Sequence, residues 1–199
     1  NRLILLILFF IGCLTTVCGQ EVLTSPDKNL VLKFDVSADG KATNELSYKG
    51  KPVIRPSLLG LDLKDKTSLM DGFSIASTSR DALDTTWAPV WGEEKIIRNH
   101  YQELAIVLEQ KAERNRHIVI RFRLFNDGLG FRYEFPKQRE LHYFTIREER
   151  TEFNLAGDHK IFWIPGDYDT NEYPYTTSLI SGIPPLQKKA TVHITAHDP

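Results

Sequence analysis

Cysteine is nearly absent from this sequence. Its two cysteines, Cys13 and Cys18, both lie within the first eighteen residues. The rest of the chain therefore has no thiol for a disulfide framework or a thiolate metal site. Such a domain depends on its hydrophobic core for stability, and about 180 residues are enough for one sizeable core.

Neither sign of charge is in excess. The chain has 25 Lys and Arg against 26 Asp and Glu, a formal net charge of −1. No basic run or stripe interrupts this balance, whereas nucleic-acid-binding proteins gather positive charge on one face. We therefore expect no nucleic-acid partner.

The sequence also lacks an apolar run long enough to span a membrane. Residues 3–12 carry no polar side chain and follow Arg2, but a spanning helix needs about 20 apolar residues. The run is typical of a signal peptide over residues 1–19, cleaved before Gln20. A membrane anchor and a lipoprotein signal acylated at Cys13 are the alternatives. We expect a periplasmic or otherwise exported protein with no stable membrane insertion after cleavage.

Helical periodicity is missing, and strand periodicity takes its place. In residues 30–36, leucine, phenylalanine and valine alternate with residues on the opposite face. Turn signals follow at Asp39-Gly40 and Lys49-Gly50. Many short strands separated by Gly and Pro turns predict an all-β fold, a large antiparallel β-sandwich, in one domain over residues 20–199.

A longer strand pair is predicted further along the chain. Leu104, Ile106 and Leu108 alternate on one strand, and residues 118–124 alternate on its partner. Asn126-Asp127-Gly128 predicts the next turn. On the opposite face of the second strand, Arg121 and Arg123 indicate a solvated or ion-paired stripe.

Three runs carry a family resemblance: Trp91–Tyr101, Arg121–Pro136 and Ile161–Thr176. In this order they resemble the N-terminal domain of glycoside hydrolase family 97, the bacterial α-glucosidases and α-galactosidases. The resemblance covers roughly residues 21–183, and residues 184–199 are atypical. It implies a β-sandwich similar to the galactose mutarotase-like supersandwich.

The resemblance also implies a role for Glu172. In the family, the glutamate of this loop binds a calcium ion together with glutamates of a (β/α)8 barrel, which also carries the catalytic carboxylates. Calcium takes six to eight oxygens and one carboxylate supplies at most two, so Glu172 needs that barrel to complete the site. We assign no catalytic residue to this chain and expect it to be inactive alone.

The function implied is that of a non-catalytic, carbohydrate-binding-type domain of an exported α-glycoside hydrolase. Its partners are an α-linked oligosaccharide and the catalytic barrel. A stand-alone sugar-binding module is the alternative. A mutarotase-like epimerase rests on the fold alone, which is a weak argument for function.

Other polar and aromatic residues have simpler interpretations. Asp167 and Asp169 are expected to cap turns rather than bind metal. The aromatic residues near them either stack on sugars or, as we expect, form core and rim: Trp163, Tyr168, Tyr173 and Tyr175.

The acidic pair Glu93 and Glu94 does not suit glycosidase chemistry, because the two carboxylates must flank the scissile bond. We expect a strand end salt-bridged to Lys95 and Arg98. Asn99 and His100 belong to the same run, and His100 is expected to be a satisfied hydrogen-bonding residue. The remaining histidines show no metal-ligand spacing: His117, His142, His159, His193 and His197.

Overall fold

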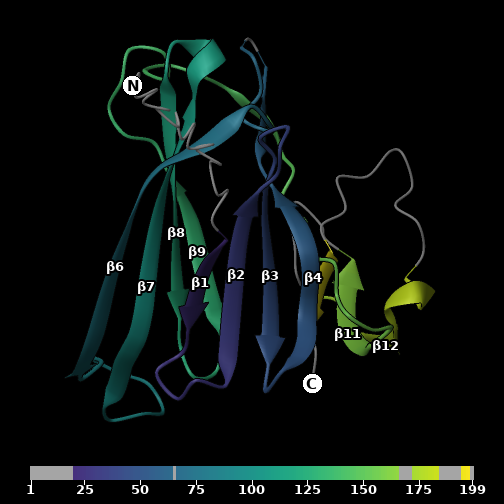
Figure 1. The fold of residues 1–199 in the computed structure, drawn as a ribbon. Helices are drawn as coiled ribbons and strands as arrows, with labels where there is room; N and C mark the ends of the chain where they lie inside the picture. The colour runs from purple at the N-terminus through teal and green to yellow at the C-terminus, as the bar shows by residue number, and fades with distance from the viewer. Residues whose placement is uncertain (1–19, 65, 166–171, 184–193, 198–199) are drawn as a thin grey trace, which may run out of the picture.

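A computed structural model describes residues 20–64, 66–165, 172–183 and 194–197 (Figure 1). These residues form strands and two short 3-10 helices, with no α-helix among them. The predicted signal peptide lies outside the described residues. Within the described part of the chain, no helix has the length and apolarity to cross a bilayer.

Two four-stranded antiparallel sheets make the sandwich. The first has the order β1-β2-β3-β4 and the second the order β6-β7-β8-β9. Their strands are β1 (Glu21–Thr24), β2 (Leu30–Val36), β3 (Ala42–Tyr48), β4 (Lys51–Leu59), β6 (Phe73–Trp87), β7 (Ile97–Gln110), β8 (Arg116–Leu124) and β9 (Leu129–Glu134). The predicted all-β sandwich is confirmed.

Two smaller sheets complete the described structure. β5 (Leu61–Leu63) pairs with β10 (Ile146–Glu149), and β11 (Lys160–Pro165) lies between β12 (Thr176–Leu179) and β13 (Ile194–His197). In Figure 1, β11 and β12 stand beside the sandwich, next to β4. The 3-10 helices are η1 (Lys111–Glu113) and η2 (Ile180–Gly182).

The core lies between the two large sheets, as the alternation of apolar residues predicts. Along β2 and β8 every second residue is buried. Phe34 of β2 meets Phe122 of β8 with ring centroids 5.9 Å apart, and both side chains are fully buried. Burying aromatic and aliphatic side chains in this way supplies most of the driving force for the fold.

Glycine is required at the turn between β2 and β3. Gly40 has a φ of 78°, and a Cβ there would lie 2.3 Å from the backbone nitrogen of Phe73. The Phe73 amide donates to the Gly40 carbonyl at 3.0 Å. This turn of the first sheet is thus fastened to the start of β6 in the second sheet.

A buried arginine closes one end of the sandwich. Arg116 is 3% exposed and donates to the carbonyls of Thr67 and Ser68 and to the Gln110 side chain, at 2.9, 3.3 and 2.6 Å. Gln110 itself donates to the Asp71 carbonyl. Because these bonds satisfy backbone acceptors, they hold the segment before β6 against the sheet.

Candidate functional site

Glu172 lies just before β12 and its side chain is exposed. Tyr173 and Tyr175 beside it are 39% and 61% exposed. Asp167, Tyr168 and Asp169 lie outside the described residues. Among the residues that are described, no three His, Cys, Asp or Glu side chains are grouped to hold a metal ion.

The strand after this loop is held in place by polar contacts. Trp163 of β11 is partly buried, and its Nε1 donates to the Ser178 hydroxyl of β12 at 3.0 Å. Asp158 accepts bonds from the backbone amide and the hydroxyl of Ser181, at 2.8 and 2.7 Å, and these bonds lower its pKa. Trp163 therefore serves the β11–β12 pairing, in line with the expected structural role.

The arginine stripe on the outer face of β8 is ion-paired. Arg121 and Arg123 both bond to Glu103 of β7, the second through Nε at 2.7 Å. Arg121 also bonds to Glu134 of β9 at 2.7 Å, and Arg132 joins the same carboxylate. These five residues, here called the outer-face network, connect three strands on the side away from the core.

The network fixes the charges of its two carboxylates. Bonds from Arg121 and then from Arg132 lower the pKa of Glu134 to about 2. Burial acts to raise the pKa of Glu103, but the bonds from Arg123 and Arg121 together outweigh it and lower that pKa. Both groups are thus ionised at neutral pH, a state suited to structural pairing and unsuited to a catalytic acid.

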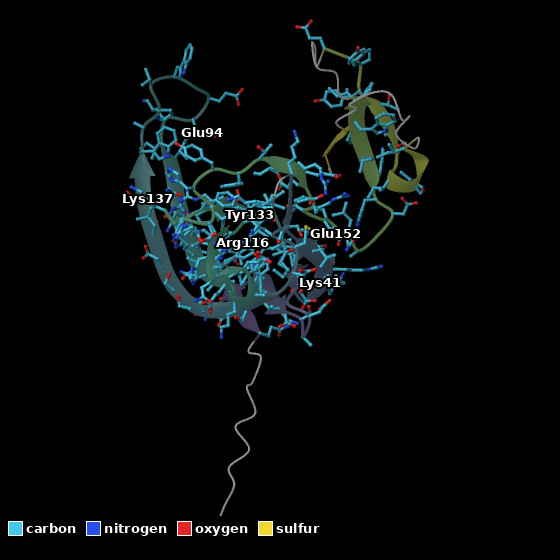
Figure 2. All side chains as sticks on the ribbon, turned by 90° about the horizontal axis from the view of Figure 1, so that it is seen from above. Lys41, Glu94, Arg116, Tyr133, Lys137 and Glu152 are labelled. Atoms are coloured by element: carbon cyan, nitrogen blue, oxygen red, sulfur yellow. The ribbon has the colours of Figure 1, made fainter. Side chains whose placement is uncertain are left out.

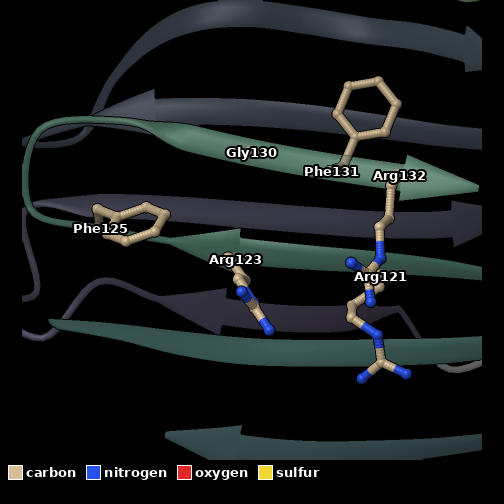
Figure 3. Close-up of a pocket in the computed structure, with 6 residues that line it drawn as sticks. All are labelled: Arg121, Arg123, Phe125, Gly130, Phe131 and Arg132. Atoms are coloured by element: carbon tan, nitrogen blue, oxygen red, sulfur yellow. The ribbon is translucent and has the colours of Figure 1, made fainter. Parts of the chain in front are cut away.

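A small hollow lies beside the network (Figure 3). Its volume is about 170 Å³, and it is open because Gly130, opposite Arg123 in the β8–β9 ladder, has no side chain. The guanidinium of Arg123 lies 4.4 Å from the centre of the Tyr101 ring, and Phe125 packs edge-on against that ring. Figure 3 shows the arginines on one side of the strands and Phe131 on the other.

The prediction for Glu93 and Glu94 is wrong. Both lie exposed in the loop between β6 and β7, and not at a strand end. Arg98 bonds instead to both carboxylate oxygens of Asp84, at 2.8 and 2.7 Å. The reason is that residues 73–87 form a strand that the sequence pattern does not indicate. This strand supplies Asp84, which lies opposite His100 and is reached diagonally by Arg98.

The other predicted polar residues are not brought together. Asn99 and His100 lie in β7, and His100 is 3.9 Å from Asp84. His117 lies 3.7 Å from Glu109 on the neighbouring strand. His142 packs edge-on against Tyr143, and His159 comes just before β11. His193 lies outside the described residues, as does the side chain of His197.

Residues 23–199 match the family model described as Glycosyl-hydrolase 97 N-terminal. The chain belongs to this family. Its fold is also similar to that of a glycoside hydrolase family 97 enzyme from Pseudoalteromonas sp. strain K8, solved in complex with panose and with acarbose. In both cases the TM-score is 0.75 and the identity 29% over 89% of this chain.

The chain spans only part of the length of the related family 97 enzyme. This chain covers 27% of the length of the Pseudoalteromonas family 97 enzyme. A β-arabinopyranosidase has a similar fold at 24% identity and a TM-score of 0.64, with 73% of this chain and 23% of that chain covered. The chain thus corresponds to the N-terminal domain of larger family 97 enzymes.

Proposed function

We propose that this chain is the non-catalytic N-terminal domain of an exported α-glycoside hydrolase. It would support a catalytic (β/α)8 barrel and act with it on an α-linked oligosaccharide. The observation that carries the proposal is the family match over residues 23–199. The structural similarity covers 27% of the related enzyme's chain. The panose and acarbose complexes of that enzyme support an oligosaccharide as the ligand of the whole protein.

The described acids support a non-catalytic role. Glycosidases use two carboxyl groups that flank the scissile bond, about 5–9.5 Å apart, one of them with a raised pKa. Glu103 and Glu134 have lowered pKa values and are held by arginines. Glu93 and Glu94 are sequence neighbours on an exposed loop. We therefore place the catalytic carboxylates on the barrel.

Glu172 is proposed to be one ligand of a calcium ion shared with the barrel. The fit is that of a partial site, because its carboxylate is exposed and supplies at most two of the six to eight oxygens that calcium takes. The ion, when bound, would supply a fixed positive charge that orients the carboxylates around it. The role of Glu172 is then to connect the two domains through the ion.

Two measurements test the proposal. The chain alone should not hydrolyse p-nitrophenyl α-glucoside or α-galactoside. Combined with the Pseudoalteromonas family 97 enzyme from which the matched N-terminal region has been deleted, it should bind calcium, and Glu172→Gln should weaken that binding by about tenfold or more. Asp127→Asn, at an exposed acid in the turn between β8 and β9, is the control. Turnover by the chain alone, or equal calcium affinity with Glu172→Gln, would refute the proposal.

A stand-alone sugar-binding module remains the second candidate, because Tyr173 and Tyr175 present partly exposed rings. Aromatic rings in such positions can stack on sugars. Calorimetry of the chain with maltooligosaccharides separates the two functions. Heat of binding that is lost in Tyr175→Ala would favour this module over the domain of a larger enzyme.

A further inference from the structure

The end of the β6–β7 hairpin carries a group of exposed apolar side chains. Two of the chain's three tryptophans are here: Trp87 is 52% exposed and Trp91 is 89% exposed. Val90 and Ile96 are 102% and 64% exposed. We call these four residues the hairpin tip. A contiguous group of exposed apolar side chains is typical of a binding surface, whereas apolar residues scattered singly over a surface are ordinary.

The hairpin presents this tip on a regular scaffold. β6 and β7 pair along their whole length up to Trp87 opposite Ile97. Close to the tip, Arg98 bonds to both carboxylate oxygens of Asp84 across the two strands. In Figure 2 the loop that carries Glu94 stands away from the body of the sandwich. The tip is thus held out from the domain by a paired, ion-bridged ladder.

The side chains at the tip surround an open hollow of about 530 Å³. Trp87, Val90 and Trp91 contribute its apolar lining, and Glu93 and Glu94 also line it. A partner surface complementary to this hollow is therefore a protruding apolar group with cationic side chains around it. Tryptophan at the centre of an interface commonly contributes a large share of the binding energy.

The position of the tip indicates which partner it meets. In Figure 2 the tip and the sheet of β11 and β12, the two strands on either side of Glu172 in the sequence, rise on the same side of the sandwich, at its two ends. One large domain placed on that side would contact both. This domain covers 27% of the chain of the related family 97 enzyme. The rest of such an enzyme is long enough to include the large domain that would contact both points.

We propose that the hairpin tip is a docking surface for the catalytic barrel of the same enzyme, at the end of the interface opposite Glu172. This inference rests on the proposed function and adds a contact that does not depend on calcium. The tip inserts its tryptophans against an apolar part of the barrel, while Glu93 and Glu94 meet cationic side chains. The hairpin and the Glu172 loop then hold the barrel at two separate points.

Co-purification tests this surface. The chain would be co-expressed with a tagged Pseudoalteromonas family 97 enzyme lacking its matched N-terminal region, and the affinity of the recovered complex measured in the presence of a chelator. The double variant Trp87→Ser, Trp91→Ser should bind at least about tenfold more weakly than the parent chain. The parent's tryptophan emission should shift to the blue on binding, since two of its three tryptophans leave water.

Tyr143→Ser is the matched control, because Tyr143 is an 81% exposed aromatic residue outside the hairpin. It should bind as the parent does, and urea unfolding should show that all variants are equally folded. If the double tryptophan variant bound with the affinity of the parent, the docking role of the hairpin tip would be refuted, while the proposed function would still stand. Absence of any complex with the parent would refute the proposed function itself. Self-association of the chain alone, lost in the double variant, would make a second copy the partner and overturn the choice of the barrel.

Discussion

Replacing Glu103 by glutamine should destabilise the domain by about 3 kcal/mol. The Glu103 side chain is 7% exposed and accepts bonds from Arg121 and Arg123, whose side chains are 26% and 40% exposed. Each charge-assisted bond is worth about 1.5–3 kcal/mol where water is excluded. Solvent around the arginines screens part of this, so the expected loss lies well below the sum of the upper values.

Urea unfolding followed by tryptophan fluorescence at pH 7 measures this loss. Glu93→Gln is the control, because Glu93 is an exposed acid in a loop, and it should change the free energy of unfolding by less than about 0.5 kcal/mol. A loss below about 0.5 kcal/mol for Glu103→Gln would show that the network is a surface feature without energetic weight, and the reasoning would be wrong.

The same pairings make stability depend on pH in one direction. Both Glu103 and Glu134 have pKa values below their ordinary ones. A carboxyl group whose pKa is lower in the folded state stabilises that state above its unfolded pKa of about 4.5, and this contribution is lost as the pH falls toward the folded value. The difference between the parent and Glu103→Gln should therefore be full at pH 7 and shrink as the pH falls below about 4.5.

Further predictions concern the turn and the closed end of the sandwich. Gly40→Ala should lower the free energy of unfolding by more than about 2 kcal/mol, because the new Cβ would meet the backbone of Phe73. Gly50→Ala, with a similar φ but open space around it, should cost only about 1–2 kcal/mol. Thermal unfolding compares the two variants, and equal losses would contradict the steric argument. Arg116→Met should cost about 2–4 kcal/mol by removing the donor of the buried Gln110 side chain and of the Thr67 and Ser68 carbonyls, and faster limited proteolysis in residues 66–72 would locate the effect. An Arg116→Met protein as stable as its parent would mean that water replaces the guanidinium.

Strands such as β2 and β8 were predictable because their buried and less buried residues alternate strictly. Leucine, isoleucine, phenylalanine and valine at every second position of residues 30–36 and 118–124 identify both strands and their buried face. β6 was missed because serine, threonine and small residues dominate it and nearly all of its side chains are exposed. Its existence depends on pairing with β7 and not on a buried stripe of its own. The error at Glu93 and Glu94 follows directly from that omission.

The outer-face network was only half predictable. Arg121 and Arg123 stood out in the sequence, but their partner Glu103 did not. The hairpin contained the missing signal, because opposite positions in a hairpin have a constant sum of residue numbers, and the pairing of Leu104 with Phe122 places Glu103 opposite Arg123. The proposed role of Glu172 differs, because a calcium site shared by two domains could not be derived from one of them.

The long strand β6 also bears on how the isolated domain behaves at high concentration. It is the last strand of its sheet and extends over 15 residues, so a row of backbone amides and carbonyls is left without a neighbouring strand in the described structure. Such a row is a template for fibril growth. Arg80, Asp81 and Asp84 place charges along it at short intervals. These charges oppose pairing with the edge strand of another chain, and so they counteract aggregation through the strand that extends the hairpin.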